Sequence, residues 1–339
     1  MASHPLDGSL ADWEEVADAD HWAVLVLGNG LSVNVWPQFA YASLFEHARD
    51  GGLTPEDLAL FDNTPNFERV LADLNTAIRV SQVAGVDASP FYERYRRIQL
   101  ALGHAIRQVH VTRSEVPNES LAAIRAELLN YEWIFTTSYD LIVYWAMGYG
   151  EVFRPFVDHF RFGGRCEFDP SRADVFDGEI PVYFLHGALH LVVGGTGVTW
   201  KLRRTAIQTL LDQFGQPIPG DPQARPLLVT EGSARDKFRA IEGNDYLSHA
   251  LELLRTLELP VVVFGSRLGQ QDQHLVDALA EHPERPVAIS LFPGTRREIA
   301  AQKADIYSRL EVDTLLFFNS RTHPLGSADL RAPVIAQRP

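Results

Sequence analysis

The chain has 339 residues, of which 46 % are hydrophobic and 22 % are charged, and its formal net charge is −14. This is the composition of a globular protein, with enough length for a large core plus an inserted helical region. A surface that binds a nucleic-acid duplex needs a basic patch, whereas the arginines form only small clusters. Direct binding of nucleic acid is therefore not expected.

The single cysteine, Cys166, excludes disulfides within the chain and a zinc module of four cysteines. The start of the sequence lacks the positively charged and apolar regions of a signal peptide. No apolar run reaches the ~18 residues needed to cross a bilayer. We therefore expect a cytoplasmic protein that makes no contact with a membrane.

A buried strand and a glycine turn are predicted at 22–32, WAVLVLGNGLS. The apolar run is short and uninterrupted, as in parallel strands, and Gly28 and Gly30 bracket Asn29 in the turn that follows. A helix is expected directly after this stretch. Glycine lets the backbone approach a ligand closely, and N–H groups at a helix start favour an anion, so the turn is a candidate phosphate site. Val33 takes the place of the third glycine of the dinucleotide-binding pattern, and a plain strand-to-helix turn is the alternative.

The region from 43 to 130 has little strand character and carries several helical signals. Helices are predicted at 43–50, from Thr54, from Pro65 or Asn66, at 91–111 and at 118–129. Thr54 is a typical N-cap because a proline and two acidic residues follow it. Since so many helices exceed one crossover between two strands, we predict that 43–130 is a helical subdomain inserted after the first strand and helix.

A second buried strand is predicted at 132–137, EWIFTT, ahead of an apolar helical stretch. The strand ends in a polar cluster of Thr136, Thr137, Ser138 and Asp140. In open α/β sheets, ligands bind at the carboxyl ends of the strands. Simple capping of the next helix by Ser138 or Asp140 is the alternative.

A third buried strand is predicted at 181–186, PVYFLH, and it ends in His186 followed by Gly187. A histidine at the end of an apolar strand can act as a base beside a nucleotide, or it can be a structural residue bonded to a backbone carbonyl. His190 follows four residues later. A metal site would need a helix at this place and a third ligand, so no metal is expected.

The remaining chain alternates between strand and helix signals. Strands are predicted at 198–201, 226–230, 260–265, 286–292 and 314–319, and helices at 203–215, 244–257 and 296–310. The strand at 260–265 runs into Gly265 and Ser266, and the tail at 321–339 has no periodicity and is expected to be loose. The fold class predicted for 1–339 is one α/β domain, with a Rossmann-like, doubly wound, mostly parallel sheet and the inserted helical subdomain.

Four predicted strands thus end in the groups GNGLS, TTSYD, HG and GS, in that order. In these motifs the chain resembles the sirtuin-like superfamily of NAD-consuming domains, across about residues 22–320. The protein deacylases of that superfamily carry a four-cysteine zinc module, which this chain lacks. NFERVL at 66–71 resembles the bacterial, defence-type branch of NAD hydrolases, and LHGALHL and FTTSYDLIVYWA look like a little-characterised subfamily of it.

The resemblance implies a role for each matching residue. Asp140 would lie near the nicotinamide end of NAD, and His186 would be the catalytic histidine near the ribose. The residues that would contact the rest of NAD are Gly28, Asn29, Gly30, Ser32, Thr136, Thr137, Gly265 and Ser266. Ser138 would share the catalytic place, where the family usually has an asparagine that contacts the ribose and helps to place the attacking water. Serine is shorter than asparagine but still donates and accepts hydrogen bonds.

The implied function is an NAD glycohydrolase that cleaves the nicotinamide–ribose bond without a metal. Such proteins serve antiphage defence by abortive infection, as oligomers held inactive until they are triggered, and some act with a HerA-type ATPase. Two alternatives are a sensor that binds NAD or ADP-ribose without catalysis, and an interaction protein that uses the helical insertion. A hydride-transfer dehydrogenase is disfavoured because the third glycine is missing.

Overall fold

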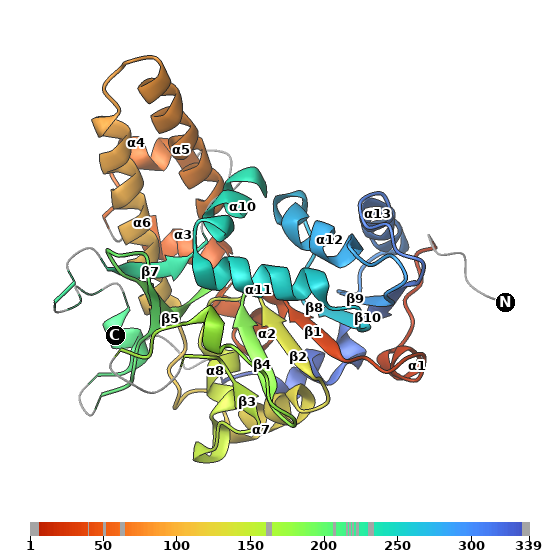
Figure 1. Ribbon diagram of the computed structural model, residues 1–339. Coiled ribbons are helices and arrows are strands. Elements are labelled where there is room, and N and C mark those ends of the chain that lie inside the picture. The colour runs from red at the N-terminus through yellow and green to blue at the C-terminus, as the bar shows by residue number, and fades with distance from the viewer. Residues whose placement is uncertain are drawn as a thin grey trace.

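The fold is built on one parallel sheet of seven strands in the order β10-β9-β8-β1-β2-β4-β3 (Figure 1). This computed structural model describes residues 7–39, 41–49, 52–61, 65–160, 165–205, 208–214, 216, 218, 220–221, 224–229 and 234–333. The strands are β1 (Val24–Leu27), β2 (Trp133–Thr136), β3 (Phe156–Val157), β4 (Ile180–Phe184), β8 (Val261–Phe264), β9 (Val287–Leu291) and β10 (Leu315–Asn319). The predicted Rossmann-like α/β class is confirmed.

The apolar runs of the sequence account for the sheet, because each central strand is buried on both faces. Every residue of β1, β4, β8 and β9 is buried. The chain leaves β1 and later returns on both of its sides, as β2 on one side and β8 on the other. In a doubly wound sheet, the carboxyl end of such a central strand is the point at which a ligand crevice forms.

Helices cover the sheet in two groups. In the first group α10 (Ala234–Glu242), α11 (Asp245–Thr256) and α12 (Gln273–Ala280) pack on one another, and α11 lies across the sheet in Figure 1. In the second group α7 (Asn118–Leu128) packs against α8 (Ile142–Met147). The remaining helices of the sheet region are α1 (Trp13–Ala17), α2 (Gly30–Val35) and α13 (Arg296–Tyr307).

The predicted helical region between β1 and β2 is present. It contains α3 (Tyr41–Arg49), α4 (Pro55–Leu58), α5 (Phe67–Val83) and α6 (Ser89–Val109), followed by α7. The helices α4, α5 and α6 form a projection that leads away from the sheet (Figure 1). Within 43–130, α7 is different because it packs against α8 beside the sheet. The predicted cap at Thr54 is confirmed, since its hydroxyl accepts a hydrogen bond from the Asp57 amide and its own amide donates to the Asp57 carboxylate.

A second, antiparallel sheet in the order β6-β5-β7 follows β4 directly. Its strands are β5 (Gly187–Val193), β6 (Thr199–Lys201) and β7 (Arg225–Leu228). The strand predicted at 181–186 ends too late, because β4 ends at Phe184. The strand β5 is not among the predicted elements. Gly187 makes this corner with a φ of +78°, and a Cβ there would lie 1.9 Å from the carbonyl oxygen of Leu227. Only glycine allows two strands to come so close at that point.

Other differences lie in helices and in the tail. The helix predicted at 203–215 is reduced to α9 (Leu210–Gln213), with part of the predicted range outside the described residues, and α10 and α12 were not predicted. The tail is packed rather than loose from 321 to 333: Leu325 is fully buried, and the Ala332 amide donates to the carbonyl of Val35. The final six positions of the tail, 334–339, lie outside the described residues. Over the described residues, no helix is both long and apolar enough to cross a membrane.

Candidate functional site

Four motifs singled out in the sequence lie at one edge of the sheet. They follow β8, β1, β2 and β4, which are consecutive neighbours in the sheet. The strand ends are level, because Leu27 of β1 pairs with Thr136 of β2 and with Phe264 of β8. The topology therefore gathers residues far apart in the sequence at the switch point of the sheet, where ligands bind in open α/β folds.

The glycines of this edge serve close packing between two loops. A Cβ on Gly28 would lie 2.5 Å from the Gly265 oxygen, and a Cβ on Gly30 would lie 2.5 Å from the Gly265 Cα. The Gly30 amide donates to the Gly265 carbonyl at 2.8 Å. The helix α2 begins at Gly30, earlier than predicted, and has only six residues. Part of the expected phosphate cradle is thus already engaged with the loop after β8.

Ser32, Ser138 and Asp140 form a compact buried cluster. The Ser32 and Ser138 hydroxyls both donate to Oδ2 of Asp140, the latter at 2.5 Å, and lie 2.9 Å from each other. The other carboxylate oxygen accepts from the amide of Ile142, the first residue of α8, at 2.8 Å. The three side chains are 0 %, 6 % and 4 % exposed. Asp140 therefore both anchors a helix start and presents an oriented carboxylate at the strand edge.

The two threonines and Asn29 support this cluster from β1 and β2. The Thr136 hydroxyl accepts a hydrogen bond from the Ser138 amide, and the Thr137 hydroxyl donates to the carbonyl of Leu27. Oδ1 of Asn29 lies 3.4 Å from the Ser138 hydroxyl oxygen. These bonds fix the loop after β2 against the turn after β1.

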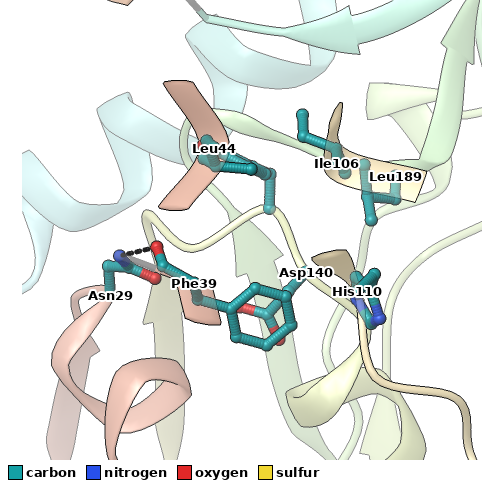
Figure 2. Close-up of a pocket in the computed structure, with 8 residues that line it drawn as sticks. Asn29, Phe39, Leu44, Ile106, His110, Asp140 and Leu189 are labelled. Atoms are coloured by element: carbon teal, nitrogen blue, oxygen red, sulfur yellow. Dashed lines mark hydrogen bonds between the residues drawn. The ribbon is translucent and has the colours of Figure 1, made fainter. Parts of the chain in front are cut away.

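A small cavity lies beside Asp140 (Figure 2). Asn29, His110, Tyr139 and Asp140 contribute the polar groups of its lining. Leu44 and Ile106 line it from the inserted region, and Phe39 lines it from just before that region. The Asn29 amide donates to the Phe39 carbonyl at 3.4 Å, the dashed line in Figure 2. The cavity volume is about 10 Å³, which is room for about one water molecule. A larger ligand would have to displace the inserted helices.

His186 lies at the corner between β4 and β5, and its side chain pairs with a histidine rather than with Asp140. Its Nε2 lies 2.9 Å from Nε2 of His274 in α12, and its carbonyl accepts from the Val229 amide. Burial, then the positive charges of Lys237 and of His274 when protonated, hold the pKa of His186 well below its usual value. At neutral pH His186 is therefore an uncharged imidazole that can accept or donate one proton. The expected site is thus divided into a hydroxyl–carboxylate cluster and a histidine pair.

Ser266 is used locally, because its hydroxyl accepts from the amide of Leu268. His190 lies within β5, fully buried against the ring of Tyr144. Over the described residues no group of three or more histidine, cysteine or acidic side chains is arranged to hold a metal ion.

Comparison with known families adds one match. Residues 25–325 match the family described as a domain of unknown function, DUF4917. The chain belongs to this family. No curated protein matches the sequence of this DUF4917 domain.

Two groups at the site of this DUF4917 domain were missed in the sequence. The first is His274 with Lys237, which pairs with Asp272 at 3.0 Å and is 2 % exposed. The second is His110, whose Nε2 accepts from the Leu141 amide and so holds the loop that carries Asp140. His274 and Lys237 lie on helices, and His110 directly follows α6; none of them has a local motif that predicts its position. The only available signal was that His274 follows the GS group by a few residues.

Proposed function

We propose that this DUF4917 domain is an NAD glycohydrolase that cleaves the nicotinamide–ribose bond. The observation that carries the proposal is the convergence of the four sirtuin-like motifs on adjacent strand ends, with Ser138 and Asp140 joined at 2.5 Å. The pattern that suggested the resemblance is scattered over more than 200 residues, and its motifs follow four strands that are consecutive neighbours in the sheet, which a position at strand ends does not by itself require.

Cleavage of the nicotinamide–ribose bond requires only charge stabilisation and a base from these residues. The nicotinamide leaving group is cationic in NAD, so it needs no proton from the protein. The protein has to stabilise a developing positive charge on the ribose, and the fixed Asp140 carboxylate supplies a negative charge for that purpose. His186, an uncharged imidazole, supplies a base for a ribose hydroxyl. Ser138 takes the place of the asparagine that would otherwise help to orient the attacking water.

We further propose that the described state is the resting state of a cytoplasmic defence effector. A cavity of about 10 Å³ beside Asp140 does not admit a nicotinamide ring. Leu44 and Ile106 belong to the inserted region, so movement of that region would open the cavity. Assembly into an oligomer, or contact with a partner such as a HerA-type ATPase, would supply the trigger.

A second candidate function is a sensor that binds NAD or ADP-ribose without cleaving it. One observation favours it: the hydroxyls of Ser32 and Ser138 are both directed at Asp140 rather than toward open space. In this case Ser138 would not replace the missing asparagine.

Nicotinamide release from NAD by the purified protein tests the proposal. The wild type is compared with His186→Ala, Asp140→Asn and the control His21→Ala, which alters an exposed histidine. Each protein is assayed over a range of concentrations to allow assembly. We expect release by the wild type and the control, and loss of about 100-fold or more in the two site variants. Calorimetric binding of NAD without release in any assembly state would support the sensor, and absence of binding would overturn both functions.

A further inference from the structure

We propose that His186 and His274 form a proton-sharing dyad in which His274 receives the charge that His186 takes from the substrate. The inference rests on the proposed function and adds a positioning residue that the sequence motifs do not contain. The two Nε2 atoms lie 2.9 Å apart, a hydrogen-bond distance, and the rings are tilted by 44°. Since only one hydrogen fits between two nitrogens at this distance, one imidazole donates and the other accepts.

The pair also has a defined place in the fold. His186 follows β4 and His274 lies in the first turn of α12, after β8. β1 and β2 lie between β4 and β8 in the sheet. The hydrogen bond therefore connects the two flanks of the candidate site across the ends of the strands that carry Asn29 and Asp140.

The tautomers decide what the pair can do. When His186 donates from Nε2, its Nδ1 holds a lone pair and is the basic nitrogen of the ring. A ribose hydroxyl can then give its proton to Nδ1 while the Nε2 proton moves to Nε2 of His274. One O–H bond and one N–H bond break and two N–H bonds form, so the charge ends on His274 and no proton is lost. In this tautomer His274 carries its own hydrogen on Nδ1, a buried atom without a hydrogen-bond partner among the described residues.

The surrounding charges favour this direction of transfer. Lys237 of α10 opposes a positive charge on both histidines, and it is held against Asp272 at 3.0 Å. Two carboxylates, Asp272 and Asp277, favour a positive charge on His274. The pKa of His274 is lowered to about 4, chiefly by burial. The carboxylate of Asp272 raises this pKa in part, and the positive charge of Lys237 lowers it. His274 is therefore neutral at rest, and it is the member of the pair that acidic groups face.

Imidazole ¹⁵N NMR of the full chain tests the dyad without any assay of activity. We expect the wild type to show one slowly exchanging N–H proton shared between the two rings, with both rings neutral at pH 6. The signal should disappear in His274→Gln and remain in the exposed control His21→Gln. A ring of His186 or His274 that titrates near pH 6.5 in the wild type would overturn the dyad.

Kinetics then test the relay. Glutamine can occupy the place of the His274 Nε2 atom but cannot take up a proton. We expect His274→Gln to bind NAD with unchanged Kd, to lose about 100-fold in kcat, and to shift the acidic limb of the wild-type pH profile, since the charge of His274 no longer acts on the pKa of His186. His274→Asn places its amide near the position of the His274 Nδ1 atom instead. Thermal melting of both variants checks that the loss of kcat is not caused by misfolding. Unchanged kcat and pH profile in a folded His274→Gln protein would reject the relay. A wild type that binds NAD but never releases nicotinamide would reject the proposed function, while the NMR spectrum would still decide whether the proton is shared.

Discussion

Ser138 donates a 2.5 Å hydrogen bond to Asp140, which lies two residues further along the chain. The same carboxylate oxygen accepts from Ser32, which reaches it from α2 on the other side of the strand edge. The bond thus joins a local turn to a residue more than one hundred positions away in the sequence. Because Ser32 and Ser138 donate to the same carboxylate oxygen, their contributions to stability should be coupled.

Ser138→Ala should lower the free energy of unfolding by about 1.5–3 kcal/mol, the usual net value of a hydrogen bond to a charged group. Ser32→Ala should cost a similar amount. Because the two hydroxyls share one oxygen and contact each other at 2.9 Å, the double variant should deviate from additivity by at least about 0.5 kcal/mol. Urea denaturation of the four proteins measures this coupling. Strict additivity would mean that the hydroxyls act independently.

Gly265→Ala should destabilise the protein more than Gly85→Ala, although both glycines have nearly the same φ. The values are +72° and +70°, so the conformational cost of a side chain, about 1–2 kcal/mol, is similar at both positions. A Cβ on Gly265 would lie 2.9 Å from the Gly30 Cα, whereas a Cβ on Gly85 meets nothing within 4 Å. The expected total is about 3 kcal/mol for Gly265→Ala and about 1 kcal/mol for Gly85→Ala. Equal losses in thermal melts would show that the loops can separate at little cost.

Ile106→Ala should increase the affinity for NAD, because Ile106 lines the cavity beside Asp140. Ile98 is the matched control: it lies on the same helix, is fully buried and does not line the cavity. Both variants should lose about 2–5 kcal/mol of stability through the cavity that they create. Isothermal titration with NAD, at a temperature where both variants are folded, distinguishes them. Tighter binding by Ile98→Ala as well would point to general loosening rather than to opening of this cavity.

Asp57 anchors the projection, and its ionisation should make stability depend on pH. Its carboxylate is fully buried and receives two hydrogen bonds from Arg97, at 2.6 and 3.0 Å. Burial raises the pKa of Asp57, but the bonds from Arg97 and from the Thr54 amide outweigh burial, and the pKa lies below its usual value. A lowered pKa contributes stability above the unfolded value of about 3.9, and that stability is lost as the pH falls through the folded value.

Asp57→Asn should therefore cost about 2 kcal/mol at pH 7, less than a wholly buried pair because the guanidinium of Arg97 stays partly exposed. The difference from the wild type should shrink as the pH falls below 4. Urea denaturation from pH 7 to pH 3 measures it, with Asp73→Asn, an exposed carboxylate of α5, as the control. A constant difference over this range would contradict the assignment.

The sequence determined those elements whose signals are local. The unbroken apolar runs of β1 and β8 predicted parallel strands because burial on both faces requires them. Thr54 predicted a helix start because a proline and two acidic residues follow it, and in the structure its hydroxyl and Asp57 satisfy each other across three residues. The same local logic placed His186, Ser138 and Asp140 at strand ends, and hence at one edge of the sheet.

Tertiary structure alone decided which side chains at that edge meet. His186 pairs with His274, 88 positions away, and not with Asp140, because the packing of α12 against α10 and α11 places His274 there. Gly187 ends β4 early and starts β5, since the approach of Leu227 admits no side chain. The tail packs on α2 through isolated apolar residues that have no period to detect. In each case the deciding contact is between segments distant in the sequence, and hydrophobic periodicity reports only which face of an element is buried, not what covers it.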